Sequence, residues 1–235
     1  MTIQFKNLLA NMWHSAYLQN EKNILTFLTP QPEATLIDLG CDNGQWCNQL
    51  AEKIQTKNIY GVDIIEERLA LAEQKGIKTY SADLNNHLPF ADNYFDIVHA
   101  NQVIEHISNL DLFISEIYRI LKKGGCVILS TENASSWCNI FASIMGWQIF
   151  SLTNITRKKS GLGNPLALHR NSLNNREYAS WTHKTIFNYQ GLIDFLKAYD
   201  FNINKIKGAG YFPLSNFFSK IDKRHSHFLS IKAYK

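Results

Sequence analysis

The chain has 235 residues, of which 45% are hydrophobic and 19% are charged, so it can bury a substantial core and resembles ordinary globular proteins in composition. It contains no run of 18 apolar residues, no apolar stretch after Lys6 long enough for a signal peptide, and no metal-ligand or disulfide-framework spacing among its four cysteines. We therefore expect a single cytoplasmic domain over residues 1–235, beginning with a helical segment over residues 1–30.

The net charge of +4 is distributed unevenly along the chain. Residues 1–132 contain 10 Lys and Arg against 16 Asp and Glu, whereas residues 133–235 contain 14 against 4. An asymmetry of this kind bears on what the protein binds and not on its fold.

The first strong motif is residues 35–44, Thr-Leu-Ile-Asp-Leu-Gly-Cys-Asp-Asn-Gly. A short apolar run ends in Asp38, and Gly40 and Gly44 follow in a turn that opens a helix. Because glycine has no Cβ and tolerates positive φ, such a turn lets the backbone approach a ligand closely. In a parallel sheet, that ligand would lie outside the carboxyl end of the strand.

The dinucleotide-binding fingerprint is the main competing interpretation of this turn. Aligned on Gly40, it requires glycines at positions 42 and 45, where the chain has Asp42 and Gln45. An anionic Asp42 would repel a pyrophosphate, and together with Asp38 it suits a ligand that carries positive charge. A plain strand-to-helix turn is the other alternative.

Two more predicted strands end in acids. The run 59–63, Ile-Tyr-Gly-Val-Asp, ends in Asp63, whose carboxylate can accept both hydroxyls of a ribose. The strand 77–81 is followed by Asp83, which can accept from an adenine amino group.

The alternation of strands with helical patterns predicts right-handed βαβ units and a parallel sheet. Apolar residues recur at helical spacing within 47–54, 110–121 and 192–199, and we interpret these faces as core. The remaining strands are predicted at 95–100, 126–131, 202–208 and 227–233. Cys47 and Cys126 are expected to be small buried hydrophobes.

In this order and spacing, the motifs resemble the class I S-adenosylmethionine-dependent methyltransferases, in the type 11 branch that includes the ubiquinone and sterol enzymes. The resemblance is strong over residues 33–132 and weaker from there to the end. It implies an α/β, Rossmann-like sandwich with a seven-stranded sheet in the order 3-2-1-4-5-7-6 and strand 7 antiparallel. It also implies S-adenosyl-L-methionine as cofactor and S-adenosyl-L-homocysteine as product.

The resemblance implies a role for each motif in holding this cofactor. The backbone of Gly40, Cys41 and Gly44 would approach the methionine end, and Asp38 and Asp42 would favour its ammonium. Asp63 would accept the ribose hydroxyls, and Ile64, Asp83 and Leu84 would contact the adenine. Asn101 and Gln102 would lie beside the methionine moiety and the sulfonium. The family commonly has glycine where this chain has Asp42, which puts that contact in doubt.

Three residues are candidates for catalysis. His106 and Glu105 follow the fourth strand, so a general-base role is open, while a structural His106 that bonds backbone is the alternative. His183 resembles a family position that faces the substrate, but it could equally be a solvated neighbour of a helix cap near Asn188. Some quinone-forming relatives place glutamate at the position of Gln102 and bind a divalent metal with the Glu-His pair. Gln102 lacks that negative charge, so we expect no metal in this protein.

Residues 133–184 form an expected substrate-side insertion or lid. Its first part, 133–156, contains no charged side chain, and a basic, breaker-rich loop follows. One helical face carries Trp137, Ile140, Phe141, Ile144 and Met145. The aromatic residues Phe141, Trp147 and Trp181 could line a substrate cavity, although aromatic residues at this spacing are more often core. Contact of this segment with a membrane interface is a further alternative.

The basic loop also bears on the charge of the substrate. Residues 157–184 contain six Lys and Arg against one acid, Glu177. Arg170 and Arg176 could bind an anionic group, whereas the alternative is a solvated loop whose charges maintain solubility.

These observations favour a methyltransferase that acts on a small or carrier-linked metabolite. An RNA or protein methyltransferase is the first alternative, but the amino-methyltransferase motif N/D-P-P-Y/F is missing after the fourth strand, where the chain reads Asn101-Gln102-Val103-Ile104. The second alternative is a non-catalytic, cofactor-binding partner subunit. The sequence does not identify the substrate or the oligomeric state.

Overall fold

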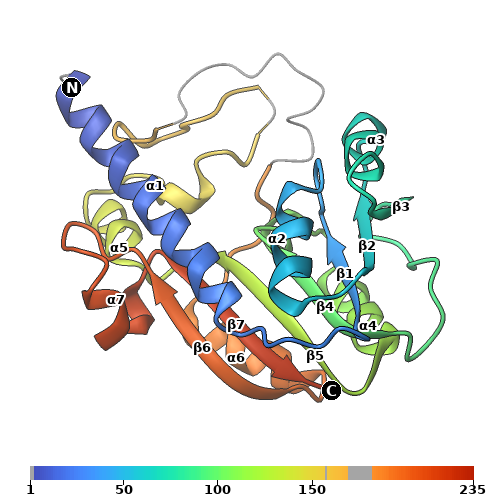
Figure 1. Ribbon diagram of the computed structural model, residues 1–235. Coiled ribbons are helices and arrows are strands. Elements are labelled where there is room, and N and C mark those ends of the chain that lie inside the picture. Colours follow the sequence, from blue (N-terminus) through green and yellow to red (C-terminus); the bar gives the residue numbers. More distant parts are fainter. Residues whose placement is uncertain (1–2, 157, 169–181) are drawn as a thin grey trace.

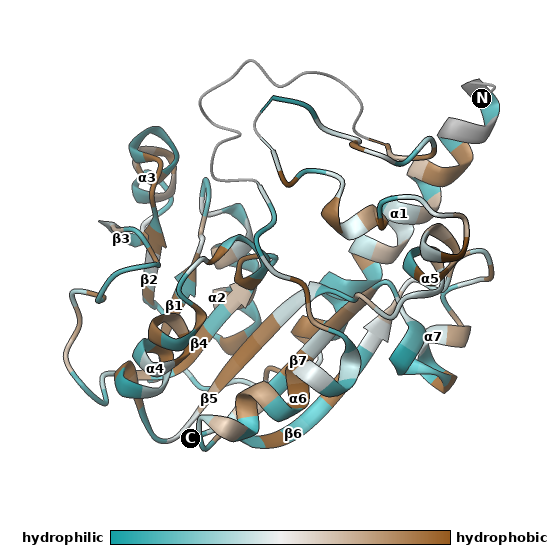
Figure 2. Ribbon diagram, turned by 180° about the vertical axis from the view of Figure 1, so that it is seen from behind, coloured by the Kyte–Doolittle hydropathy of each residue, from teal (hydrophilic) through white to brown (hydrophobic). Residues whose placement is uncertain are grey.

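The computed structural model describes residues 3–156, 158–168 and 182–235, which form one mixed sheet with helices on both faces (Figures 1 and 2). The sheet has seven strands in the order β3-β2-β1-β4-β5-β7-β6, which confirms the predicted topology. The strands are β1 Thr35–Leu39, β2 Asn58–Asp63, β3 Lys78–Ser81, β4 Phe95–Asn101, β5 Leu121–Glu132, β6 Asn202–Ala209 and β7 Phe228–Tyr234.

The helices alternate with these strands as the sequence pattern predicts. The α-helices are α1 Ile3–Leu25, α2 Gln45–Ile54, α3 Glu66–Glu73, α4 Leu110–Ile120, α5 Trp137–Ile144, α6 Tyr189–Ala198 and α7 Phe218–Ile221. Short 3-10 helices are η1 Ile104–His106, η2 Phe150–Leu152 and η4 Lys223–His225. The predicted cap of α6 is present, because the Asn188 side chain accepts a hydrogen bond from the backbone N–H of Gly191 at 2.6 Å.

Two apolar cores fill the two sides of the sheet. One contains the buried faces of α4 and α6, and the other those of α1, α2 and α3. Neighbouring residues of β1 serve different cores, since Leu36 packs with the α2 side and Ile37 with the α4 side. Figure 2 shows α4 and α6 on the near face of the sheet, with α1 behind it. Cys47 and Cys126 are buried in the second core, as predicted.

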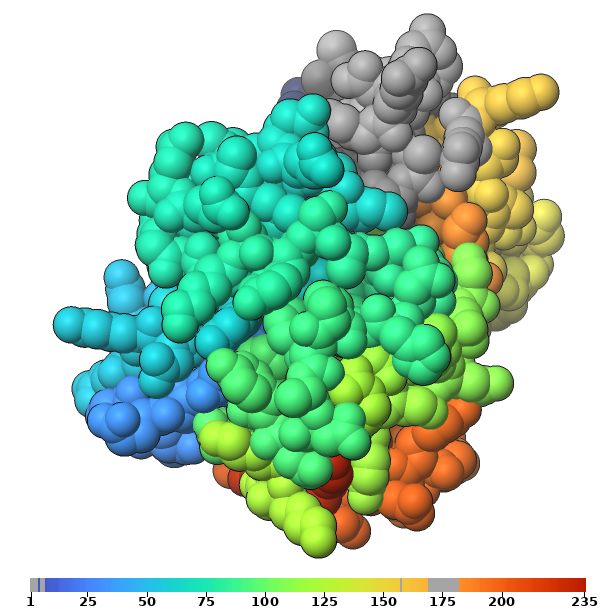
Figure 3. Space-filling view, turned by 90° about the vertical axis from the view of Figure 1, so that its right-hand side faces the viewer, coloured from blue at the N-terminus to red at the C-terminus, as the bar shows by residue number. Residues whose placement is uncertain are grey.

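The sheet direction determines where a ligand can approach. Strands β1, β2, β3, β4 and β5 are parallel, whereas β7 is antiparallel to both β5 and β6. The carboxyl ends of β1, β4, β5 and β6 therefore lie at the same edge of the sheet. In Figure 3, the side of the molecule beyond β3 is covered mainly by the part of the chain coloured cyan to green, which includes α3 and the connection 82–94.

Strand β5 begins five residues earlier than the predicted 126. Leu121 pairs with Phe95, and Ile97 pairs with Cys126, so the register shifts between these two pairs. Gly124 has a φ of 78° within the extra segment. An irregularity of this kind extends the strand beyond the apolar run that the sequence shows.

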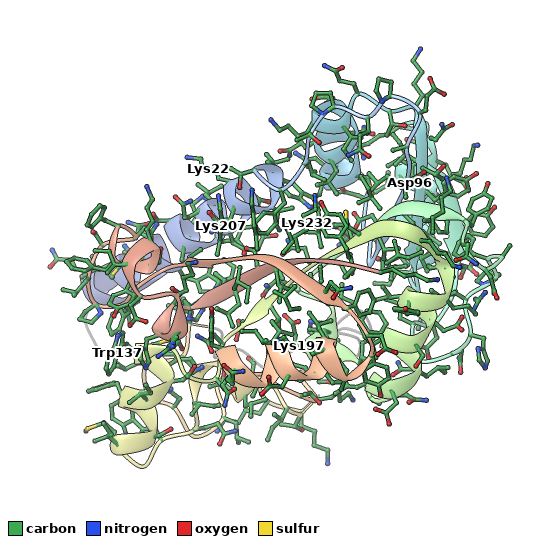
Figure 4. The ribbon with its side chains drawn as sticks, turned by 90° about the horizontal axis from the view of Figure 1, so that it is seen from below. Lys22, Asp96, Trp137, Lys197, Lys207 and Lys232 are labelled. Atoms are coloured by element: carbon green, nitrogen blue, oxygen red, sulfur yellow. The ribbon has the colours of Figure 1, made fainter. Side chains whose placement is uncertain are left out.

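The apolar face of α5 is largely exposed, which corrects the expectation that its aromatic residues belong to the core. Trp137 and Phe141 are 40% and 41% exposed, and Ile144 is 77% exposed. The helix instead buries Cys138, Asn139 and Ala142. Trp137, labelled in Figure 4, stacks its ring on that of His225 in η4, with centroids 4.6 Å apart.

Helix α1 lies over β6 and β7, and lysines tie its carboxyl end to the sheet. The buried Lys232 donates to the carbonyl of Phe27 at 2.9 Å, and Lys207 donates to the Thr26 hydroxyl at 2.6 Å (Figure 4). Within the described residues, no helix combines the length and apolar character needed to span a bilayer.

Candidate active site

The turn after β1 is shaped by glycines that no larger residue could replace without displacement. Gly40 has a φ of 78° and Gly44 a φ of 75°. A Cβ on Gly40 would lie 2.7 Å from the Val103 side chain, and one on Gly44 would strike Ile77 and Ala72. The predicted cradle is therefore present as backbone geometry at the carboxyl end of β1.

Asp38 anchors this turn from below. It is 3% exposed, and its two oxygens accept from His99 Nδ1 at 2.7 Å and from Cys47 Sγ at 3.0 Å. Trp46 Nε1 donates to His99 Nε2 at 3.3 Å, so the proton of the neutral imidazole lies on Nδ1. A hydrogen bond with Cys41, burial and the Asp38 charge all raise the pKa of Cys47, which keeps it a thiol donor.

Both oxygens of Asp38 thus have internal partners. Its carboxylate fixes the loop and contributes negative charge to this edge, while its burial separates it from a direct contact with a ligand. His99 and Trp46 were not singled out from the sequence. A histidine within the apolar run 95–100 was the available signal, since a buried polar group needs a partner.

Asp63 and Asp42 organise the upper part of the turn. Asp63 Oδ2 accepts from the backbone N–H of Asp42 at 2.9 Å, and Oδ1 accepts from that of Ile65 at 3.0 Å. The Asp42 carboxylate pairs with Arg68 at 3.0 Å, which offsets the additional negative charge in the loop. The apolar side chain of Ile64 is 54% exposed beside Asp63, an arrangement that leaves it free to pack on a ligand.

Asp83 and Leu84 follow β3 and are partly buried. Asp83 Oδ1 accepts from both the backbone N–H and the side-chain amide of Asn85, at 2.9 and 2.8 Å. The carboxylate is thereby held in place at the end of β3, at the same edge as Asp63.

Asn101 and Gln102 end β4, and α1 reaches them from the side. Asn20 is fully buried and donates to Asn101 Oδ1 at 3.1 Å. The hydroxyl of Tyr17 also bonds the Asn101 side chain, and burial and Glu21 raise its pKa. Gln102 has a φ of 55° and donates to the Ser130 hydroxyl at 3.3 Å.

Tyr17 and Asn20 were not predicted as site residues. In the sequence, polar side chains on a helix near a chain terminus suggest a solvent-exposed face. The packing of α1 across β5 and β7 shows that Asn20 is buried instead. The Asn20 oxygen accepts from Ser130 and Ser230 at 2.8 and 2.7 Å, so one buried amide joins α1 to both strands.

The structure brings Glu105, His106 and His183 together. The rings of the two histidines lie 4.8 Å apart, and one ligand atom from each of the three residues lies within 4.8 Å of the others. His106 Nδ1 bonds the Thr182 carbonyl at 3.3 Å, and His183 Nδ1 bonds the Ser151 carbonyl at 2.5 Å. Because a carbonyl can only accept, both Nδ1 atoms carry a proton and both Nε2 atoms are left without these carbonyl contacts.

Burial controls the protonation of this group. Glu105 is 1% exposed; its Oε2 accepts from Thr131 at 3.0 Å, and its Oε1 has no hydrogen-bond partner among the described residues. Burial raises the pKa of Glu105 to about 8. Burial and the neighbouring His183 lower the pKa of His106 to about 4, so His106 is neutral at physiological pH. The spacing of the three residues could also hold a cation, and the expected lack of a metal stays a prediction.

Three predicted substrate residues lie outside the described part of the chain. These are Arg170, Arg176 and Trp181. Phe141 and Trp147, also candidates for the cavity, contact each other with ring centroids 5.8 Å apart.

An apolar cavity of about 540 Å³ lies at the same edge of the sheet, beside α1. Its wall includes Leu9, Met12, Trp13, Leu166, Phe212 and Leu214. Cys138 and His227 also line it, with Sγ and Nδ1 3.2 Å apart. Burial opposes charge on both groups, but their mutual attraction outweighs it, raising the pKa of His227 to about 9 and lowering that of Cys138.

Comparison with known proteins adds independent information. Residues 37–129 match a family model described as a methyltransferase domain. A demethylmenaquinone methyltransferase of Listeria welshimeri is 28% identical over 133 residues, which are 51% of this chain and 55% of that protein. Phosphoethanolamine N-methyltransferase 2 of Caenorhabditis elegans is 32% identical over 120 residues, which are 48% of this chain and 27% of that protein.

The chain thus spans about half the length of the first of these relatives and less of the second. Among solved structures, an S-adenosylmethionine-dependent methyltransferase from Mesorhizobium loti superimposes with a TM-score of 0.59. The match covers 91% of this chain and 96% of that one at 18% identity, so it supports the fold alone.

Proposed function

We propose that this chain, whose residues 37–129 match a methyltransferase domain family, transfers a methyl group from S-adenosylmethionine to a small or carrier-linked metabolite. The observation that carries the proposal is the glycine turn closed against Val103, with Asp63 and Asp83 at the same edge of the sheet. This arrangement offers close backbone approach together with two separate carboxylates.

The residues present fit the cofactor. Backbone of Gly40, Cys41 and Gly44 would hold the methionine end, and Asn101 and Gln102 would lie beside it. Asp63 would accept the ribose hydroxyls, with further contacts to the adenine from Ile64, Asp83 and Leu84. The carboxylates engage backbone N–H groups through some of their lone pairs, and each oxygen can accept more than one hydrogen bond.

The internal contacts refine two assignments. Asp38 would act through its charge and by fixing the turn, since His99 and Cys47 occupy its oxygens. Asp42 remains a candidate for binding the methionine ammonium. The ammonium would compete for the Asp42 carboxylate with Arg68, which already forms an ion pair with it.

When bound, S-adenosylmethionine supplies a methyl group already activated by the sulfonium. The protein then has to orient the acceptor and exclude water. We assign His106 as the base, because its Nε2 is neutral and unprotonated and lies on the segment that follows β4. His183 would share the site, and the neutral carboxyl of Glu105 would lie buried beside the two rings.

The names of the relatives include a quinone-type and a phosphoethanolamine methyltransferase, which are consistent with small metabolites. The basic residues Arg170 and Arg176 would favour an anionic acceptor. Contact of this chain with a nucleic acid, a membrane surface or an activator subunit stays untested, and transfer to RNA or protein and a non-catalytic subunit are the competing functions.

Calorimetry tests the cofactor directly. The wild-type protein should bind S-adenosylmethionine or S-adenosylhomocysteine in preference to NAD. Asp63→Ala should weaken this binding roughly ten- to a hundred-fold, because a hydrogen bond to a charged group contributes about 1.5–3 kcal/mol. Glu67→Ala, at an exposed acid in the first turn of α3, is the matched control and should leave the affinity unchanged.

Absence of binding by the wild type, or preference for NAD, would refute the proposal. Incubation of labelled cofactor with cell extract and the protein would then identify the accepted methyl group. A labelled RNA or polypeptide would favour the first alternative, and binding without any labelled product would favour the non-catalytic one.

A further inference from the structure

The apolar cavity beside α1 is a second binding region at the active edge of the sheet. Its wall combines α1 with the segment that follows β6, and Cys138 contributes from α5. Its volume of about 540 Å³ lies in the range of roughly 300–1,000 Å³ that holds organic ligands in proteins. The turn after β1 and this cavity therefore share one edge but are separate places.

The mouth of the cavity exposes apolar side chains to solvent. Leu214 is 48% exposed and Phe217 is 60% exposed, and both line the cavity. Exposed apolar side chains that continue into an apolar hollow mark a place where a ligand removes them from water. Polar groups are sparse: Asn216 is engaged by Ser15 at 2.9 Å, and Cys138 and His227 engage each other.

An aromatic trio connects the cavity with the predicted cofactor region. Trp13 lines the cavity and stacks on Tyr17 at 5.4 Å, and both rings contact Phe228 edge-on. The Tyr17 hydroxyl bonds Asn101, one of the residues assigned to the methionine end. Trp13, in the wall of the cavity, thus lies one helical turn from Tyr17, the residue that contacts Asn101.

We propose, resting on the proposed function, that this cavity binds the hydrocarbon portion of an amphiphilic acceptor, whose polar end carries the methylated atom. The apolar wall fits a chain or an extended ring system, whereas an ionised group would lose most of its hydration there. Nε2 of His227 is the buried ring nitrogen of this wall that has no hydrogen-bond partner in the described part of the chain. The concave shape favours a single molecule over a flat bilayer surface. Ile144 on α5 and Ile221 on α7 are also exposed, but they do not line the cavity.

Fluorescence titration with cis-parinaric acid, an 18-carbon polyene acid, tests the cavity without requiring turnover. The wild-type chain should bind the probe. Leu214→Asp, which places a charge at the mouth without disturbing the core, should weaken binding roughly tenfold or more. Ile144→Asp is the matched control, because Ile144 is 77% exposed and does not line the cavity, and it should bind within twofold of the wild type.

Circular dichroism and thermal melting of both variants would establish that they are folded. Failure of the wild type to bind the probe, or equal loss in both variants, would overturn the proposal. Binding to phosphatidylglycerol vesicles that Ile144→Asp abolishes, with no binding of the monomeric probe, would assign this face to a membrane instead. Calorimetry with S-adenosylmethionine separates the two proposals: cofactor binding without probe binding refutes only the cavity, and probe binding without cofactor binding refutes the acceptor assignment together with the proposed function.

Discussion

The imidazole rings of His106 and His183 lie 4.8 Å apart, one directly after β4 and the other in the segment that leads to α6. A backbone carbonyl accepts from Nδ1 of each ring, which fixes the orientation of both imidazoles. His106 is neutral at physiological pH, so its Nε2 can accept a proton at the edge where the strands end, beside the buried carboxyl of Glu105.

His106→Ala should lower kcat by about 10²–10⁴ with a small effect on KM, because it removes the base but no assigned contact with the cofactor. The measurement is the rate of labelled methyl transfer to the acceptor identified in extract. His87→Ala is a suitable control, since the His87 side chain is 80% exposed and lies on the connection after β3. Equal rates for His106→Ala and the wild type would leave His106 a structural residue.

Removal of metal ions should not change activity. We expect proton transfer at His106 to operate without a divalent ion, even though Glu105, His106 and His183 are spaced so that they could hold one. Transfer rates before and after dialysis against EDTA are the measurement. A loss that magnesium or zinc restores would contradict this expectation and would make the three residues ligands.

The contribution of Glu105 to the stability of the protein should decrease as the pH rises from about 4.5 to 8. The pKa of Glu105 is raised to about 8 in the folded state, so folding binds a proton that is released on unfolding in this range. The stabilisation is complete below the unfolded pKa and is lost as the pH rises through the folded one. Each unit of difference corresponds to about 1.4 kcal/mol, so the total is a few kcal/mol.

Urea unfolding at several pH values measures this effect, with Glu105→Gln as the comparison. Glutamine is neutral at all pH values and can still accept from Thr131, so the variant should show a flatter stability profile between pH 4.5 and 8. Identical profiles for the two proteins would show that Glu105 is not the group that titrates.

Gly40→Ala should destabilise the protein more than Gly76→Ala. Both glycines have left-handed φ values, 78° and 82°, and this conformation costs an alanine about 1–2 kcal/mol at either position. Only at Gly40 would the new Cβ also meet Val103, at 2.7 Å, whereas nothing lies within 4 Å of the position at Gly76. The difference in melting temperature between the two variants measures the cost of the contact between the new Cβ and Val103. Val103→Ala should therefore restore part of the stability lost in Gly40→Ala, but none of that lost in Gly76→Ala.

Asp38→Ala should cost more stability than Asp42→Ala. The first change leaves His99 Nδ1 and the Cys47 thiol buried without an acceptor, at about 1–3 kcal/mol for an unsatisfied group. The second removes only an exposed ion pair with Arg68, whose contribution is about 0–1 kcal/mol. Equal urea midpoints would show that the carboxylate does not anchor the turn.

Much of the fold was predictable because its signals are local. Strands β1 and β2 are short apolar runs that end in or next to an acid, and helical periodicity marks the helices between the strands. The strand order came from the family resemblance, since periodicity contains no information on which strands are neighbours. The early start of β5 was missed because Lys122, Lys123 and two glycines conceal the pairing of Leu121.

The site was predictable where one strand end supplies the group, as at Asp63, and less so where distant elements meet. His99 on β4 pairs in register with Asp38 on the neighbouring strand β1, and Asn20 contacts Asn101 from α1. The face of α5 shows the limit of periodicity: the same spacing suits a helix packed in a core and one that presents its apolar side to solvent, and only the neighbouring elements distinguish them.

Helix α1 borders both binding regions, with Trp13 and Ala16 at the cavity and Tyr17 and Asn20 at Asn101. A rigid helix cannot adjust at one end without consequence at the other, so occupancy of the two regions is expected to be thermodynamically linked. Such linkage is reciprocal. An acceptor that tightens the binding of S-adenosylmethionine must itself be bound more tightly in its presence, and by the same factor.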